Sequence, residues 1–336
     1  MKLYSEQRFG LVRACVAREG QPLLYAEGPV LDPSLTLWGT RSVARLTAKS
    51  GRIGFLRLAD GQDSMADLSD PDALNEGTAV EVEIAAEARA DKLARARLLG
   101  VSEGPPRRLS DTLTLIERLK QQARRLINPQ LRFEPCEDPD ALDIAEAQAT
   151  QPSFDLPGGG YLSIEPTRAL IACDIDMGRA GEGMIHTPRQ AAKRLNEVAV
   201  EEVVRRLRLS NLAGLVVVDL IGNKHNGEKL TGLVQSAFAA EGRAIACGPI
   251  TRFGTLEFSR PWGARPHTED TPLRAARQLL WRAMAEARSD AGGRLILRAP
   301  GPVADQVRQC LKDSLDPLTP RLSVETASLS EVVPLR

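Results

Sequence analysis

This sequence of 336 residues has no long hydrophobic run, no paired cysteine spacing and no excess of either charge. Purely apolar runs such as residues 215–218 are far shorter than the roughly 20 residues that a membrane-spanning helix needs. The first ten residues contain no apolar signal core. We therefore expect a cytoplasmic protein that does not enter a membrane. The five cysteines lie tens of residues apart, which indicates neither a disulfide framework nor a Cys-x-x-Cys zinc site.

Charge and aromatic content limit how the chain could bind nucleic acid. Forty-four Lys and Arg balance forty-four Asp and Glu, so no overall field draws the protein onto a polyanion and local patches would have to hold one. Aromatic residues make up 4% of the chain, which restricts the surfaces on which bases could stack. With 43% hydrophobic and 26% charged residues, the composition is that of a folded globular protein. At about 150 residues per domain, the length indicates two or three domains.

The first hundred residues have the pattern of short β-strands. Residues 8–27 predict a hairpin with Gly20 at its turn, and residues 35–48, 52–58 and 78–84 are further strand-like runs. Several short strands within about 65 residues favour a small barrel. An RNA-binding OB fold is one such barrel, but the strand pattern alone does not distinguish it from the others.

Proline and glycine mark the next boundaries. They break the β pattern at residues 102–108, after which Ser110 is expected to cap a helix over residues 111–127. The basic face of this helix is either solvated or turned toward phosphates. A second, shorter helix is expected around residues 138–149, before a run of three glycines.

From residue 161 the pattern becomes α/β. Residues 161–165 and 169–176 predict neighbouring strands, and Thr187 begins a helix with a single apolar stripe. Residues 215–221 then predict a strand buried on both faces. A strand, crossover helix and strand form a right-handed unit, which sets the two apolar strands parallel. In the last 70 residues, helix-like and strand-like segments again alternate, but they are shorter.

Carboxylates end both apolar strands. Asp174 and Asp176 close the first strand and share one face, while Asp219 closes the second. Ligands of parallel α/β sheets bind beyond the carboxyl ends of the strands. Three carboxylates near one point repel one another unless a cation lies between them, and Mg²⁺ prefers such oxygen ligands. The alternative for each aspartate is a turn or a helix cap.

The familiar motifs of other enzyme classes are missing. The glycine runs at residues 158–160 and 178–183 match neither a Walker loop nor a dinucleotide fingerprint. No Ser-His-Asp or Cys-His spacing indicates nucleophilic catalysis.

Three stretches resemble the catalytic core of the ribonuclease E/G family, in the family's order and at about its spacing: LPGGGYLSIEPTRALIACDIDMGRA (156–180), LNEVAVEEVVRRLRLSNLAGLVVVDLIGN (195–223) and ITRFGTLEFSR (250–260). In that family the core is a deoxyribonuclease-I-like subdomain in which two aspartates hold Mg²⁺ for endonucleolytic cleavage of single-stranded RNA. Asp174 and Asp219 fall on those two positions. The resemblance therefore implies an Mg²⁺-dependent hydrolase, with Mn²⁺ as an alternative ion.

The resemblance is weaker outside this core but extends over most of the chain. It implies a multidomain fold of mixed α/β and β type. Its expected parts are RNase-H-like N-terminal strands at 1–34, an inserted OB-fold-like barrel at 35–102, a helical connector completing the RNase-H-like part at 103–152, a deoxyribonuclease-I-like catalytic subdomain at 153–262 and a small α/β domain at 263–336.

The resemblance also implies the residues that bind RNA. Arg252 and Arg260 occupy matching basic positions in the third stretch and are expected to bind phosphates as charge-assisted forks. Arg179, after the glycine loop, is a further candidate, and the alternative for each arginine is a surface ion pair. In the barrel, Phe55 matches one RNA-facing aromatic position, and we expect Lys92 to contact RNA.

Several residues depart from the family pattern. Asp176 stands where the family has Asn, so it adds a negative charge and remains a third catalytic candidate. Gly222 replaces an acidic residue that the family usually carries after the second metal aspartate. Residues 262–270 contain no cysteine, so we expect no zinc and a monomer or dimer rather than a zinc-linked tetramer. Only about 50 residues remain where the family carries its sensor for RNA 5′-monophosphates, so recognition of that end is expected to be lost.

Two function classes and a third, less favoured one remain at this point. The first is a compact endoribonuclease that cleaves single-stranded RNA during RNA processing or decay. The second is a catalytically weak or inactive RNA-binding or scaffold protein on the same fold, which the altered Asp176 and the neutral charge would suit. The third is a metal-dependent phosphoesterase that acts on small substrates.

Overall fold

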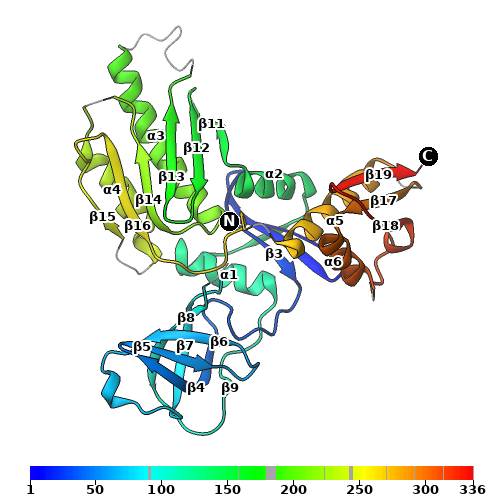
Figure 1. The fold of residues 1–336 in the computed structure, drawn as a ribbon. Helices are drawn as coiled ribbons and strands as arrows, with labels where there is room; N and C mark the ends of the chain where they lie inside the picture. The colour runs from blue at the N-terminus through cyan, green and yellow to red at the C-terminus, as the bar shows by residue number, and fades with distance from the viewer. Residues whose placement is uncertain are drawn as a thin grey trace.

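A computed structural model describes most of the chain, and Figure 1 shows four parts gathered around the N-terminal strands. The described residues are 1–89, 92–157, 159–178, 187–222, 224–241, 245–269, 271–290, 292–312 and 314–335. No helix in these ranges combines the length and the apolar composition needed to cross a membrane.

The first part is a four-stranded sheet with a helix on each face. Its order is β10-β1-β2-β3, with β1 (Lys2–Arg8), β2 (Leu11–Arg18), β3 (Gln21–Pro29) and β10 (Glu134–Cys136). Successive strand residues point to opposite faces, so Val12 packs under α1 (Leu115–Leu126) and Cys15 against α2 (Pro139–Thr150). The predicted hairpin is β2 and β3. Strand β10 pairs parallel with β1 although the second part of the molecule lies between them in the sequence.

The helix predicted after Ser110 is present as α1, but its predicted start is wrong. Thr114 is the N-cap, because its hydroxyl accepts the backbone N–H of Glu117 while the Glu117 carboxylate accepts the N–H of Thr114. The Ser110 hydroxyl accepts the N–H of Arg41 instead. Ser110 therefore lies in the segment that leads from the small barrel, described next, to helix α1.

The second part is a small closed barrel, as the short strands predicted. Strands β4, β5, β6, β8 and β7 form the ring, because β5 pairs with β4 as well as with β6. The bounds are β4 (Arg41–Ser50), β5 (Ile53–Arg57), β6 (Asp63–Asp67), β7 (Ala79–Ala86), β8 (Ala94–Val101) and β9 (Arg107–Arg108), the last pairing with β4. In β7 the alternation puts Val80, Val82 and Ile84 in the barrel core. The barrel is consistent with an inserted OB type.

The third part is a six-stranded sheet in the order β11-β12-β13-β14-β16-β15. Its strands are β11 (Ser153–Asp155), β12 (Tyr161–Pro166), β13 (Ile171–Asp176), β14 (Gly214–Asp219), β15 (Ala246–Cys247) and β16 (Thr255–Arg260). Helices α3 (Pro188–Leu209) and α4 (Gly227–Phe238) supply the apolar residues that cover one face. The other face is exposed or half-exposed along β12, β13, β14 and β16. The two strands predicted as neighbours, β12 and β13, pair antiparallel, and the predicted parallel pair β13–β14 is confirmed.

The fourth part is a small α/β unit at the C-terminal end. Its sheet has the order β18-β17-β19, and two helices pack on it. The elements are α5 (Pro272–Ser289), β17 (Arg294–Ala299), α6 (Gly301–Leu311), β18 (Leu322–Thr326) and β19 (Glu331–Leu335). Phe9 and Leu11, at the turn between β1 and β2, join its core, and Arg8 forms an ion pair with Asp316. These contacts tie the two ends of the chain together.

Candidate active site

Asp174 and Asp219 are direct partners in the six-stranded sheet. The parallel register of β13 and β14 pairs the two residues, and adjacent strands lie about 4.8 Å apart. Both side chains are exposed on the face that α3 and α4 leave uncovered. Neither carboxylate makes a hydrogen bond or ion pair with any residue in the described ranges. The described residues thus leave two negative charges side by side without a partner.

Alternation along the two strands explains this placement. Ile171, Cys173 and Ile175 point into the core beneath α3, so Asp174 points the other way. On β14, Val216 and Val218 fill the same core, which leaves Asp219 on the open face. The apolar residues thus fix the face on which both carboxylates lie.

Asp176 does not join the pair. It is the partner of Tyr161, and its Oδ1 accepts the backbone N–H of Gly178 at 2.7 Å. No group of three or more His, Cys, Asp or Glu side chains in the described part of the chain is arranged to hold a metal. The expectation that all three carboxylates gather at one point is therefore wrong. One strand repeat, about 7 Å, separates residues two apart, and Asp176 instead shapes the turn after β13.

Hydroxyl groups flank the carboxylate pair on both sides. Ser163 of β12 is the partner of Asp174, and Thr255 of β16 is the partner of Asp219. The Thr255 hydroxyl lies 2.7 Å from that of Thr251 and donates to Glu257 at 3.0 Å. Paired residues of adjacent strands share a face, so four oxygen-bearing side chains form one row across the sheet. The sequence does not reveal this row, because it gives no register between strands.

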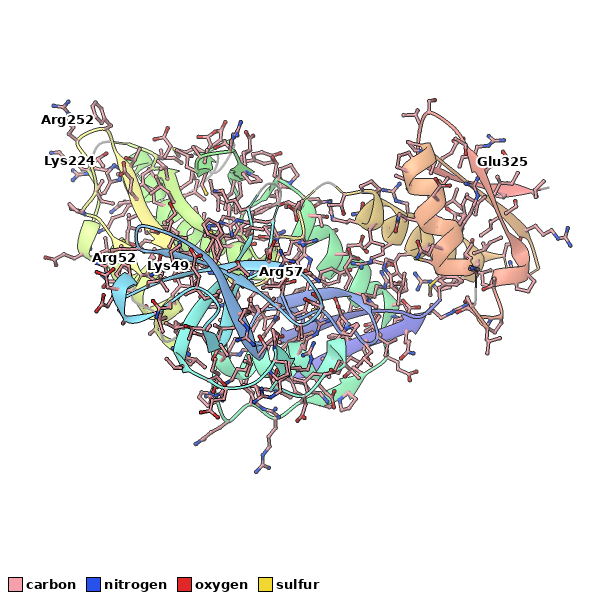
Figure 2. The ribbon with its side chains drawn as sticks, turned by 60° about the horizontal axis from the view of Figure 1, so that its bottom comes forward. Lys49, Arg52, Arg57, Lys224, Arg252 and Glu325 are labelled. Carbon is pink, nitrogen blue, oxygen red and sulfur yellow. The ribbon has the colours of Figure 1, made fainter. Side chains whose placement is uncertain are left out.

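Arg252 lies at the edge of the sheet beyond Asp219. It is exposed in the loop that leads into β16, with its guanidinium 4.7 Å from the ring centre of Phe253. Phe253 is 76% exposed. Figure 2 shows Arg252 and Lys224 at the same corner of the molecule. A cation and an aromatic ring thus stand together in solvent near the end of the strand that carries Asp219.

A basic cleft of about 600 Å³ adjoins this corner. The N-terminal turn of α3 and the loop after β14 line it, with Thr187, Arg189, Gln190, Lys193, Lys224, His225 and Asn226. Both ring nitrogens of His225 are buried, and neither has a hydrogen-bond partner among the described residues. The sequence gives no signal for this burial, because His225 follows Lys224 in a polar loop. Three cations and no carboxylate line the cleft, which suits an anionic strand.

Arg260 lies far from this corner, and its predicted role as a phosphate clamp is wrong. Its side chain is buried on the helix-covered face and donates to the carbonyl oxygens of Leu207 at 2.9 Å and Leu212 at 2.7 Å. It also forms an ion pair with Glu241 at 3.1 Å. Alternation along β16 was the available signal, because Arg260 shares its phase with the core residues Leu256 and Phe258.

The remaining predicted RNA contacts lie elsewhere. Phe55 is half-buried on the outer side of β5, and Lys92 is exposed in the connection between β7 and β8. Both belong to the barrel, whose strands lie apart from the six-stranded sheet in Figure 1, and Lys92 pairs with Arg89, which contacts Trp262 at the end of β14 opposite Asp219. The structure therefore does not bring these two residues to the carboxylate pair. Arg179 lies outside the described residues.

A divalent cation fits the donor set of the open face. Two carboxylates without partners repel each other at this spacing, and a cation between them relieves that repulsion. Oxygen is the only ligand atom that the row of Ser163, Asp174, Asp219 and Thr255 offers, which suits a hard ion such as Mg²⁺.

Comparison with known proteins points to one family. Residues 108–262 match the model of the Ribonuclease E/G family. Ribonuclease E of Nostoc sp. is 34% identical over 121 residues, which are 35% of this chain and 17% of that protein. Ribonuclease E of Escherichia coli is 35% identical over 114 residues, or 33% and 11% of the two chains. A chloroplastic ribonuclease E/G-like protein of Arabidopsis thaliana is 28% identical over 107 residues, or 31% and 11%. The matched part thus spans less than a fifth of the length of each of these relatives.

Proposed function

From the match of residues 108–262 to the Ribonuclease E/G family model, we propose that the chain is an endoribonuclease that hydrolyses phosphodiester bonds in single-stranded RNA. The observation that carries the proposal is the carboxylate pair. Asp174 and Asp219 lie opposite each other on an open face, and both are free of partners among the described residues. The names of the relatives are those of nucleases, and nothing in the comparisons favours the non-enzymatic RNA-binding alternative.

Asp174 and Asp219 would hold the metal ion, Mg²⁺ or Mn²⁺. When bound, that ion stabilises negative charge on a phosphate and lowers the pKa of a coordinated water. The hydroxyls of Ser163 and Thr255 flank the two carboxylates and can hydrogen-bond a phosphate oxygen or a water there. We expect no zinc, because residues 262–270 have no cysteine.

Arg252 would bind the phosphate that is attacked or one next to it. Its guanidinium has no ion pair within the described residues, so its donors are available for a charge-assisted fork to phosphate. The exposed ring of Phe253 offers a base a stacking surface beside it. Lys193 and Lys224 in the basic cleft would continue the path of the RNA backbone past the end of β14.

The barrel would hold a second stretch of the same RNA strand. A five-stranded ring of OB type is a common surface for single strands, and Phe55 and Lys92 are its proposed stacking and phosphate contacts. In the family's terms, we infer that the six-stranded sheet is the deoxyribonuclease-I-like core and that the N-terminal sheet is RNase-H-like. We propose a monomer or dimer without a zinc link.

The test is a gel-based cleavage assay of single-stranded A/U-rich RNA. The wild type should cleave it in Mg²⁺ buffer, and Asp174→Asn and Asp219→Asn should each lower the rate by roughly a thousandfold, as expected when several kcal/mol of metal-derived stabilisation is lost. Asp140→Asn is the matched control, because Asp140 is exposed on α2 and should leave the rate unchanged.

Two results would count against the proposal. One is wild-type protein that leaves such RNA intact over a range of Mg²⁺ and Mn²⁺ concentrations. The other is RNA binding that survives both aspartate substitutions while no product forms with the wild type, which would indicate a scaffold protein.

A further inference from the structure

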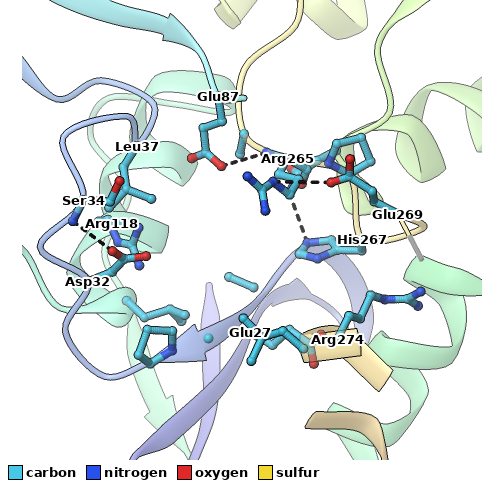
Figure 3. Close-up of a pocket in the computed structure, with 18 of the residues that line it drawn as sticks. Glu27, Asp32, Ser34, Leu37, Glu87, Arg118, Arg265, His267, Glu269 and Arg274 are labelled. Atoms are coloured by element: carbon cyan, nitrogen blue, oxygen red, sulfur yellow. Dashed lines mark hydrogen bonds and ion pairs between the residues drawn. The ribbon is translucent and has the colours of Figure 1, made fainter. Parts of the chain in front are cut away.

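A cavity of about 320 Å³ lies where all four parts of the molecule meet, away from the carboxylate pair. The N-terminal sheet contributes Glu27, the barrel Glu87, and helix α1 Arg118. The segment that follows β16 contributes His267, and α5 contributes Arg274 and Arg277. Figure 3 shows these walls, with Arg118 and Arg274 on opposite sides. Neither Asp174 nor Asp219 lines it, so it is a separate site.

Three arginines in this cavity lack the partners that buried guanidinium groups normally have. The Nε–H groups of Arg118, Arg274 and Arg277 are each buried without a hydrogen-bond acceptor. None of the three guanidinium groups forms an ion pair with a residue that the structure describes. A buried donor left unsatisfied costs about 1–3 kcal/mol, more when it is charged. Three of them around one cavity call for an explanation.

Most other charged groups of the cavity wall are already satisfied. Arg265 donates to the Ala88 carbonyl at 3.0 Å and forms an ion pair with Glu269 at 3.3 Å. Glu87 accepts the backbone N–H groups of Trp38 and Arg265, both at 3.0 Å. These pairings leave the three arginines as the cations whose donors are still unused.

His267 and Glu27 complete the electrostatics of the cavity. Burial lowers the pKa of His267 to about 4, so its ring is neutral near pH 7. Burial raises the pKa of Glu27, against the opposing effect of Arg277 and Arg274. The Glu27 carboxylate accepts one hydrogen bond, from the Tyr25 hydroxyl at 3.2 Å. It therefore retains acceptor capacity for a neighbouring donor.

We propose that this cavity binds a phosphomonoester of about the size of a mononucleotide, with its phosphate on Arg274 and Arg277. These residues are three apart on α5, so their guanidinium groups lie on one face of the helix. Guanidinium forks match phosphate oxygens, and a phosphomonoester offers three of them where a carboxylate offers two. Arg118 and Glu27, from other walls, would bind hydroxyl or amine groups on the body of the ligand.

The proposed ligand would contact several parts of the protein at once. Its phosphate would be held by α5, and its body would reach residues of α1, the barrel and the N-terminal sheet. A ligand that binds only the folded state raises its stability in proportion to occupancy. Binding should therefore raise the unfolding temperature of the whole chain.

The test is isothermal titration calorimetry at constant ionic strength with three probes: a nucleoside 5′-monophosphate, inorganic phosphate and the unphosphorylated nucleoside. The wild type should bind the monophosphate and not the nucleoside. The double variant Arg274→Gln/Arg277→Gln should bind it at least roughly tenfold more weakly, since two charge-assisted contacts are lost. Arg282→Gln, an exposed arginine on the same helix, is the matched control and should bind like the wild type.

The outcomes separate the sources of the phosphate. Binding of inorganic phosphate as tightly as of the monophosphate, with the same dependence on Arg274 and Arg277, supports the site and assigns it to the free ion. No binding of any probe, or equal binding by the double variant, would overturn the proposal. Equal binding by the double variant would also indicate that the probe occupies the RNA-binding surface instead.

Thermal unfolding without ligand distinguishes binding residues from structural ones. The double variant loses no hydrogen bond or ion pair to a described residue, and the buried Glu27 carboxylate can bind a proton when the nearby positive charges are gone. The ligand-free double variant should therefore unfold at about the wild-type temperature. It should also lose the rise in unfolding temperature that the monophosphate gives the wild type. A double variant that unfolds clearly earlier without ligand would contradict the assignment, because the arginines would then stabilise the fold themselves.

Discussion

In the N-terminal sheet, the guanidinium of Arg13 is fully buried and lies 2.8 Å from Glu6, 2.6 Å from Asp143 and 3.5 Å from Glu146. In the six-stranded sheet, Asp174 and Asp219 lie side by side without a partner in any described range. In the first cluster the fold itself supplies the partners of the buried charge, as a folded chain must do in its interior. The second leaves its charge to be neutralised from outside. A charge that the fold does not satisfy is thus the better guide to a binding site.

The largest effect expected from this comparison is on folding. Replacing Arg13 by Met should lower the free energy of unfolding by roughly 3–5 kcal/mol, because three carboxylates lose their shared cation. Urea unfolding followed by circular dichroism measures this. Arg18→Met, an exposed position on the same strand, is the control and should change stability little.

Asp219→Asn gives the opposite result in the same measurement. Its unfolding free energy should equal or exceed that of the wild type, since the substitution removes repulsion from Asp174 and breaks no pairing. If Asp219→Asn destabilised the protein as much as Arg13→Met, the distinction between the two regions would be lost.

A smaller effect is expected from His267, which avoids a buried charge by staying neutral. Its pKa of about 4 lies below the ordinary 6.5, and its Nε2 lies 2.8 Å from the Tyr25 carbonyl oxygen. As pH falls, His267 therefore binds a proton in the unfolded chain before it does so in the folded protein. The contribution of His267 to the free energy of unfolding is complete above about pH 6.5 and is lost as pH falls toward 4. The stability difference between wild type and His267→Gln should shrink by roughly 3 kcal/mol from pH 7 to pH 4. A constant difference would show that another group carries the pH dependence.

The smallest effects separate the two arginines of the third family-like stretch. Arg260→Gln should lower the free energy of unfolding by roughly 2 kcal/mol while cleavage per folded molecule stays the same, because its guanidinium bonds only to the protein. Arg252→Gln should leave stability unchanged and weaken binding of single-stranded RNA about tenfold. Equal behaviour of the two variants in a filter-binding assay would contradict the assignment.

Local sequence patterns predicted the elements of the six-stranded sheet but not their register. Alternation along β13 and β14 and the crossover through α3 were enough to expect Asp174 and Asp219 on neighbouring strands. The row with Ser163 and Thr255 was not predictable, because register depends on how whole strands pack. The separation of Asp176 from the pair has a different origin, because one strand repeat of about 7 Å lies between it and Asp174.

Contacts between distant segments account for the rest. Alternation along β16 would have placed Arg260 in the core, but a family-like motif outweighed it. The cavity arginines come from α1 and α5, which are far apart in the chain, so no local pattern could bring Arg118 near Arg274. The start of α1 differs from the prediction at Ser110 because the capping box with Glu117 selects Thr114 as the N-cap.

The chain enters and leaves the barrel at a single point. Leu31 forms a bridge with Thr114, and the N–H of Leu115 donates to the Val30 carbonyl at 2.9 Å, while β10 completes the sheet begun by β1. The residues just before and just after the barrel are thus as close together as two paired strands of a hairpin. The barrel is therefore an insertion that a short turn between Leu31 and Thr114 could replace. A different single-strand-binding domain could be inserted at the same two residues without interrupting the N-terminal sheet.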